Sequence, residues 1–140
     1  MSLPPAAPLV PPHLQTFLAF DFGRKRTGVA SGNRLMVNAT PQRTIRAEAS
    51  AARLLQVQER VRQWQPAALG VGVTFHPDGA SLENTVLARK FARQLRASVQ
   101  LPVYEVDERY STTEALADGA ADPDAGAACV ILEQFLRSIG

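Results

Sequence analysis

The chain has 140 residues, of which 46% are hydrophobic and 20% are charged, and its formal net charge is +2. This length suits one domain with a single core, and no apolar run approaches the ~20 residues that a membrane-spanning helix needs. The only cysteine, Cys129, excludes an internal disulfide framework and a cysteine-based zinc site. We therefore expect a cytoplasmic globular domain whose mildly basic charge permits a nucleic-acid partner without requiring one.

The beginning of the chain differs in composition from the rest. Residues 1–16 contain five prolines and no Asp, Glu, Lys or Arg. Because they lack a basic segment and are interrupted by prolines, they do not have the pattern of a signal peptide. We expect residues 1–16 to be a flexible proline-rich leader and residues 17–140 to form the domain.

An apolar run that ends in one carboxylate and three basic residues opens the domain. Residues 17–20 predict a buried strand, Asp21 stands at its end, and residues 24–26 are Arg-Lys-Arg. A lone buried carboxylate is costly unless it is paired or binds a metal, so this pattern suits a site that holds a cation and attracts phosphate. The alternative is a hairpin in which Asp21 only caps the turn.

Two further strands are predicted to complete an antiparallel meander. Residues 27–31 form the second strand, and Gly32-Asn33 has the composition of a hairpin turn. Residues 35–37 are the predicted third strand, which ends by Pro41.

Helices and strands alternate in the remainder of the chain, as the change from a period of two to a period of three or four indicates. The predicted elements are a helix from about residue 47 to Pro66, a buried strand over 67–73, a helix that begins near Ser81, a strand over 101–106, a short helix over 111–117, and a last helix opened by Asp124.

This order predicts an α/β fold with a five-stranded mixed sheet, in which three antiparallel strands precede parallel crossovers and helices flank the sheet. In such open sheets, functional residues gather at the carboxyl ends of the parallel strands. Asp21 ends the first strand, and Asp107 and Glu108 end the last one. If those two strands are neighbours, their carboxylates meet.

The acids at these positions, together with Asp124, suggest a metal site. Converging carboxylates repel one another, and a divalent ion such as Mg²⁺ or Mn²⁺ relieves the repulsion through oxygen ligands. Two such ions ~4 Å apart can drive an in-line phosphoryl displacement. Taken singly, each acid has a simpler explanation: Asp124 as a helix cap, and Asp107 and Glu108 as a solvated strand end.

Three motifs extend this pattern into a resemblance that covers nearly the whole chain after residue 16. They are Phe-Asp-Phe-Gly-Arg-Lys-Arg-Thr-Gly-Val-Ala at 20–30, Asp-Glu-Arg-Tyr-Ser-Thr-Thr at 107–113, which is the most specific, and Asp-Ala-Gly-Ala-Ala at 124–128. In these motifs the chain resembles the YqgF/RuvX family, the Holliday-junction-resolvase-like proteins with an RNase H-like fold that are proposed as pre-16S rRNA nucleases.

The resemblance implies a metal-dependent endonuclease that hydrolyses phosphodiester bonds of structured nucleic acid, in the processing of the 5′ end of pre-16S rRNA. It implies Mg²⁺ or Mn²⁺ as cofactor, with Asp21, Glu108 and Asp124 as catalytic metal ligands. Asp107 and Thr112 would support these ligands, and Arg24, Lys25, Arg26 and Arg109 would contact phosphates.

Other functions compete with this one. A Holliday junction resolvase would act on branched DNA, which presents the same phosphodiester as the rRNA precursor. A non-catalytic RNA-binding ribosome-assembly factor is favoured by the short, acidic segment 117–123, where the family has a longer basic one, and disfavoured by the retained acids. An actin-like ATP-binding protein also begins with a strand and Asp-x-Gly, but it needs two lobes, and this length supplies one.

Overall fold

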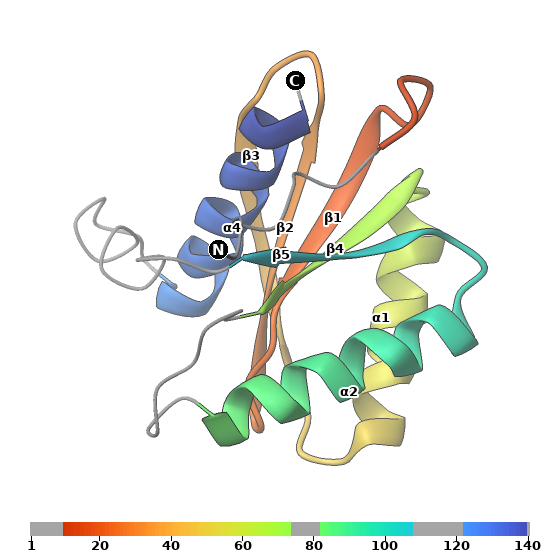
Figure 1. Ribbon diagram of the computed structural model, residues 1–140. Coiled ribbons are helices and arrows are strands. Elements are labelled where there is room, and N and C mark those ends of the chain that lie inside the picture. The colour runs from red at the N-terminus through yellow and green to blue at the C-terminus, as the bar shows by residue number, and fades with distance from the viewer. Residues whose placement is uncertain (1–9, 74–81, 108–121, 140) are drawn as a thin grey trace, which may run out of the picture.

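The computed structural model describes residues 10–73, 82–107 and 122–139 (Figure 1). Within these ranges five strands form one sheet in the order β3-β2-β1-β4-β5. β2 runs antiparallel to β1 and β3, whereas β1, β4 and β5 are parallel. The predicted five-stranded mixed sheet is therefore confirmed. Its strands are β1 (Thr16–Asp21), β2 (Arg26–Asn33), β3 (Ala39–Arg46), β4 (Ala68–Val73) and β5 (Val103–Asp107), and the helices are α1 (Ser50–Trp64), α2 (Leu82–Ser98) and α4 (Pro123–Ile139).

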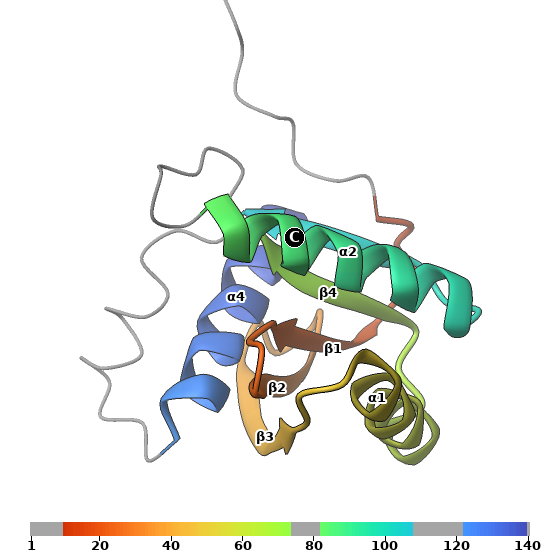
Figure 2. The ribbon, with the colours of Figure 1, turned by 90° about the horizontal axis from the view of Figure 1, so that it is seen from below.

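Helices cover both faces of the sheet, with α1 and α2 on one side and α4 on the other (Figure 2). Side chains of the central strand β1 point alternately to the two faces of the sheet and pack into the hydrophobic core on each side. Phe20 packs edge to face on Phe91 of α2, with ring centroids 6.1 Å apart, and Phe17 packs in the same way on Phe135 of α4 at 5.5 Å. Because residues 17–20 of β1 are buried on both faces, this part of the strand is an uninterrupted apolar run.

The third strand begins later than the sequence predicts. β2 continues through Gly32 and Asn33, which pair with β1, and the chain turns over residues 34–38. The predicted turn at 32–33 and the predicted strand at 35–37 are therefore wrong. Pro41 lies inside β3 rather than ending a strand. It is tolerated there because β3 is an edge strand, where a residue without an N–H group can be accommodated.

Arg34 ties the segment before β1 to the turn between β2 and β3. Its guanidinium group donates hydrogen bonds to the carbonyl oxygens of Val10, Pro11 and Leu14 at 3.0, 2.8 and 3.2 Å. Val10 and Leu14 also pack against the core on the α4 side of the sheet. Hydrogen bonds and apolar contacts thus join the described part of the expected leader to the domain.

The predicted helices over 47–66 and after Ser81 correspond to α1 and α2, and the last helix corresponds to α4. The short helix predicted over 111–117 lies outside the described residues. Among the helices of the described ranges, none combines the length and the apolar character needed to cross a membrane.

Candidate functional site

The carboxyl ends of the parallel strands lie at one edge of the sheet, where Asp21 ends β1 and Asp107 ends β5. The condition for their carboxylates to meet, that these two strands are neighbours, is not fulfilled, because β4 lies between them and pairs with both. Two inter-strand steps of about 4.8 Å separate the two strand ends by roughly 10 Å. The two acids therefore lie at the same edge of the sheet, with the end of β4 between them.

A close approach of backbone to backbone brings Asp124 to the same edge. Gly28 of β2 is the cross-strand partner of Asp21. A Cβ atom on Gly28 would lie 1.9 Å from the backbone oxygen of Asp124, so only glycine permits the first turn of α4 to pack so closely on β2. As a result, α4 begins directly against the position beside Asp21.

Several predicted site residues lie just outside the described ranges. They are Glu108, Arg109 and Thr112, and the description of β5 ends at Asp107. Within the described ranges, no group of three Asp, Glu, His or Cys side chains is arranged to hold a metal ion. The site of three acids therefore remains a prediction, two of whose members, Asp21 and Asp124, lie at the same edge.

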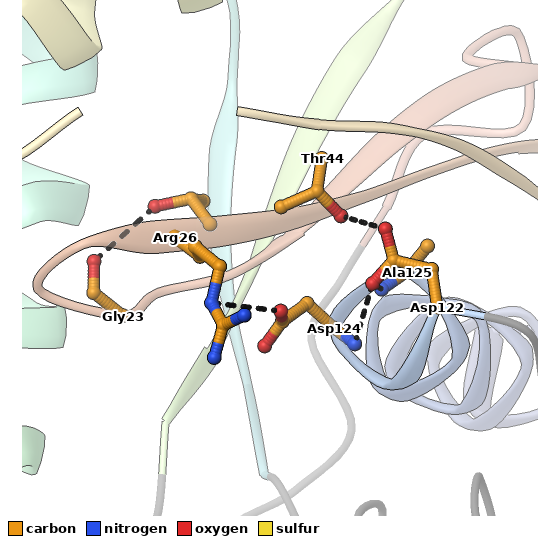
Figure 3. Close-up of polar contacts among 7 residues, drawn as sticks. Gly23, Arg26, Thr44, Asp122, Asp124 and Ala125 are labelled. Carbon is orange, nitrogen blue, oxygen red and sulfur yellow. Dashed lines mark hydrogen bonds and ion pairs between the residues drawn. The ribbon is translucent and has the colours of Figure 1, made fainter. Parts of the chain in front are cut away.

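Asp122, for which no role is predicted from the sequence, caps α4. Its Oδ1 accepts hydrogen bonds from the backbone N–H groups of Asp124 and Ala125 at 3.0 and 3.4 Å, and its Oδ2 accepts one from the Thr44 hydroxyl at 2.6 Å (Figure 3). The hydrogen bond from Thr44 holds the pKa of Asp122 below its ordinary value, although partial desolvation opposes this effect. The cap position is thus filled, and the alternative in which Asp124 caps the helix is wrong. Pro123 was the available signal, because proline favours the first position after a cap.

The carboxylate of Asp124 instead faces a cation from the first hairpin. Its Oδ2 lies 3.5 Å from Nε of Arg26 (Figure 3). The Arg26 side chain is 59% exposed and that of Asp124 is 32% exposed, so the ion pair contributes at most about 1 kcal/mol to stability. This ion pair is weak enough for a divalent cation to replace Arg26 beside the Asp124 carboxylate.

A buried arginine fixes the basic turn between β1 and β2. Arg53 of α1 is only 3% exposed, and its Nη2 donates to the carbonyl oxygens of Arg24 and Ala47 at 2.6 and 2.9 Å. Its guanidinium group also lies 4.7 Å from the centroid of the Phe22 ring, and burial lowers its pKa. The backbone of the turn is thereby held, while the side chains of Arg24 and Lys25 are exposed.

The role of Arg53 is likewise not predicted from the sequence. The available signal was its place on the buried side of the predicted helix, in line with Val57 and Arg60 at spacings of three and four. On the exposed side of the turn, Arg24 forms an ion pair with Glu83 of α2. The hairpin that carries Asp21 is therefore joined to both helices on its face of the sheet.

The strand order, the single antiparallel strand β2 and the acids at the carboxyl edge define an RNase H-like fold. Among solved structures, "T. thermophilus RuvC in complex with Holliday junction substrate" is similar with a TM-score of 0.59, over 90% of this chain and 96% of that chain, at 16% sequence identity. At this identity the likeness concerns the fold alone.

Sequence comparison identifies the family. The RuvX model, described as Holliday junction resolvase, matches residues 15–138. A relative from Polaromonas sp. (strain JS666 / ATCC BAA-500) is 66% identical over 134 residues, which are 96% of each chain, and one from Paraburkholderia phytofirmans is 47% identical over 130 residues, 89% of each chain. Both carry the name "Putative pre-16S rRNA nuclease". The chain belongs to the RuvX family.

Proposed function

We propose that the chain is a metal-dependent endonuclease that hydrolyses phosphodiester bonds in structured nucleic acid, with the precursor of 16S rRNA as its substrate. The observation that carries this proposal is the packing of Asp124 on Gly28, the cross-strand partner of Asp21. Two acids from opposite ends of the chain thereby lie at the edge that also bears the exposed bases Arg24 and Lys25. The names of relatives that span nearly the whole chain support RNA as the substrate.

The chemistry of the acids suits a hard divalent cation, on which nucleases of the RuvC and RuvX type generally depend. We propose Asp21, Glu108 and Asp124 as the ligands of Mg²⁺ or Mn²⁺, because carboxylate oxygens are the donors that these ions prefer. Asp124 is suited to this role since Asp122 satisfies the helix terminus in its place. When bound, the ion would activate a water molecule and stabilise the leaving oxygen.

The remaining site residues act on the substrate and on the ligands. Arg24, Lys25, Arg26 and Arg109 bind phosphates, and Asp107 and Thr112 support the carboxylates. Arg53 keeps the turn in place, so the phosphate-binding side chains have a fixed backbone behind them.

A Holliday junction resolvase is the second candidate. It is favoured by the description of the family model and by the structural neighbour, which is bound to a Holliday junction substrate. Both candidates use the same acids and differ in the shape of the nucleic acid that reaches them.

One parallel assay tests these functions. The purified protein is incubated with Mn²⁺ and either an rRNA precursor that contains the 5′ flank of 16S rRNA or a four-way DNA junction, and products are separated on a denaturing gel. An Asp21→Asn variant and a reaction with EDTA are the controls. Cleavage of the precursor that both controls abolish supports the proposal, and cleavage of the junction alone supports the second candidate. Binding of RNA without cleavage in any reaction contradicts both and indicates an assembly factor.

A further inference from the structure

A polar pocket adjoins the candidate site on the side of β2 and β3. It has a volume of about 350 Å³ and lies between these strands and the first turn of α4. Its lining residues are Arg26, Thr44, Arg46, Asp122, Pro123 and Asp124.

Two arginines face each other across the strands at this pocket. Arg26 of β2 and Arg46 of β3 are direct cross-strand partners, and both are exposed. Like charges at such positions destabilise a sheet unless an opposite charge compensates them. Asp124 forms an ion pair with Arg26, whereas the side chain of Arg46 makes no hydrogen bond or ion pair within the described ranges and interacts with the charge of Asp122 only at longer range.

The carboxylate of Asp122, although it lines the pocket, is already engaged. One oxygen accepts the Thr44 hydroxyl, and the other accepts two N–H groups of α4. The contact of Arg26 with Asp124 uses Nε, which leaves its Nη nitrogens for another acceptor. Within the described residues, the pocket thus combines the guanidinium group of Arg46, which has no hydrogen-bond partner there, with the Nη donors of Arg26.

We propose that Arg46, together with Arg26, binds a backbone phosphate of the substrate in this pocket, next to Asp124. The inference rests on the proposed function and adds Arg46 to its binding residues. A phosphodiester fits better than free phosphate, because it carries a single charge and the pocket retains the negative charge of Asp122. The bound phosphate accepts hydrogen bonds from the facing arginines and fixes the strand that passes Asp124.

The test compares Arg46→Gln with Arg43→Gln, a matched control on the same strand whose exposed side chain lies outside the pocket lining. Binding of a fluorescein-labelled RNA hairpin and of a labelled four-way DNA junction is measured by anisotropy in EDTA over a range of salt concentrations. For Arg46→Gln we expect roughly fivefold weaker binding at 0.15 M salt, and a slope of log K against log salt that is smaller by about 0.9. Arg43→Gln should bind like the wild type, and both variants should keep its melting temperature.

Equal losses in the two variants would indicate a diffuse basic surface and overturn the inference, as would unchanged binding by Arg46→Gln. A second arm titrates the wild type with inorganic phosphate and follows the arginine Nε–Hε signals by NMR. Binding of inorganic phosphate as tight as that of the hairpin would overturn the assignment to a phosphodiester. These binding measurements are made without metal and do not depend on catalysis. If the wild type cleaves nothing in the Mn²⁺ assay, the proposed function is refuted, but a binding defect of Arg46→Gln still supports the phosphate site. If the wild type cleaves and Arg46→Gln binds nucleic acid as tightly as the wild type, only the phosphate site in this pocket is refuted.

Discussion

Asp122 accepts the backbone N–H of Asp124 at 3.0 Å, so two acids that are two positions apart at the start of α4 have different tasks. The first is bonded to the helix terminus and to Thr44 of β3, while the second faces Arg26. The cap thereby anchors the helix and frees the carboxylate of Asp124 for a ligand.

Removal of this cap should destabilise the protein. Asp122→Ala is expected to lower the free energy of unfolding by about 1–2 kcal/mol, because it loses the acceptor for the helix N–H groups. Asp124→Asn should change it by less than about 1 kcal/mol, since its ion pair with Arg26 is exposed. Urea denaturation measures both variants. A larger loss for Asp124→Asn than for Asp122→Ala would contradict the assignment of the cap.

The stabilising effect of Asp122 should depend on pH. The hydrogen bond from Thr44 lowers the pKa of Asp122 in the folded state, so the carboxylate stabilises the fold above the unfolded pKa of about 3.9. This contribution is lost as the pH falls through the folded pKa. The difference in unfolding free energy between the wild type and Asp122→Asn should therefore be full at pH 6 and shrink below about pH 4. Thr44→Val should reduce this dependence, whereas Thr40→Val, on the exposed part of the same strand, should leave it unchanged.

The contact between β2 and α4 should tolerate no side chain at residue 28. In Gly28→Ala the new methyl group would meet the backbone of Asp124, and we expect a loss of about 3 kcal/mol in unfolding free energy. Gly70→Ala in β4 is the control, because its Cβ would find its nearest neighbour at 3.5 Å, an ordinary contact. Thermal unfolding compares the two. Equal stabilities would show that α4 does not approach β2 so closely.

The acids should affect cleavage and metal binding more than affinity for nucleic acid. Asp21→Asn and Asp124→Asn are each expected to reduce cleavage by about two orders of magnitude or more, since several kcal/mol of metal-derived stabilisation are lost. Binding of nucleic acid in EDTA should be equal or slightly stronger, because one negative charge is gone. The rise in melting temperature on addition of Mn²⁺ should be smaller in Asp124→Asn than in the wild type. An undiminished rise would exclude Asp124 as a metal ligand.

Arg53 should be required for the shape of the basic turn. Arg53→Met leaves the carbonyl groups of Arg24 and Ala47 without their donor, and we expect a loss of about 1–3 kcal/mol in unfolding free energy. Arg62→Met, an exposed change of the same kind on the same helix, should cost less than about 0.5 kcal/mol. Denaturation curves provide the comparison, and similar losses in both variants would argue against a specific role of Arg53.

The sequence predicts the helices and strands that have a clear local pattern. It leaves ambiguous the features that depend on which strands lie side by side in the sheet. The strand at 17–20 and the helix of α1 follow from apolar runs and spacing. Pro41 misleads, because only the position of β3 at the edge of the sheet makes a proline acceptable there. The insertion of β4 between β1 and β5 likewise follows from crossover connections and not from any residue in those strands.

For the site, the sequence identifies Asp21 and Asp124 as acids at element ends, and the packing through Gly28 explains why they lie at one edge. The alternative in which Asp124 caps the helix is wrong, because Asp-Pro-Asp offers two candidates and the hydrogen bond from Thr44 to Asp122 is a contact between distant segments. A phosphate-binding role of Arg46 could not be predicted from the sequence, because it depends on the strand register that places Arg46 opposite Arg26.

The contact of Gly28 with Asp124 joins one of the first strands to the last helix of the described chain. Proteins are synthesised from the amino terminus, and early elements can pair before late ones exist. β1 and β2 can therefore form their hairpin, with Asp21 in place, while Asp124 has yet to be added. On the proposed function, a nascent chain has no complete catalytic centre until α4 has emerged and docked on β2.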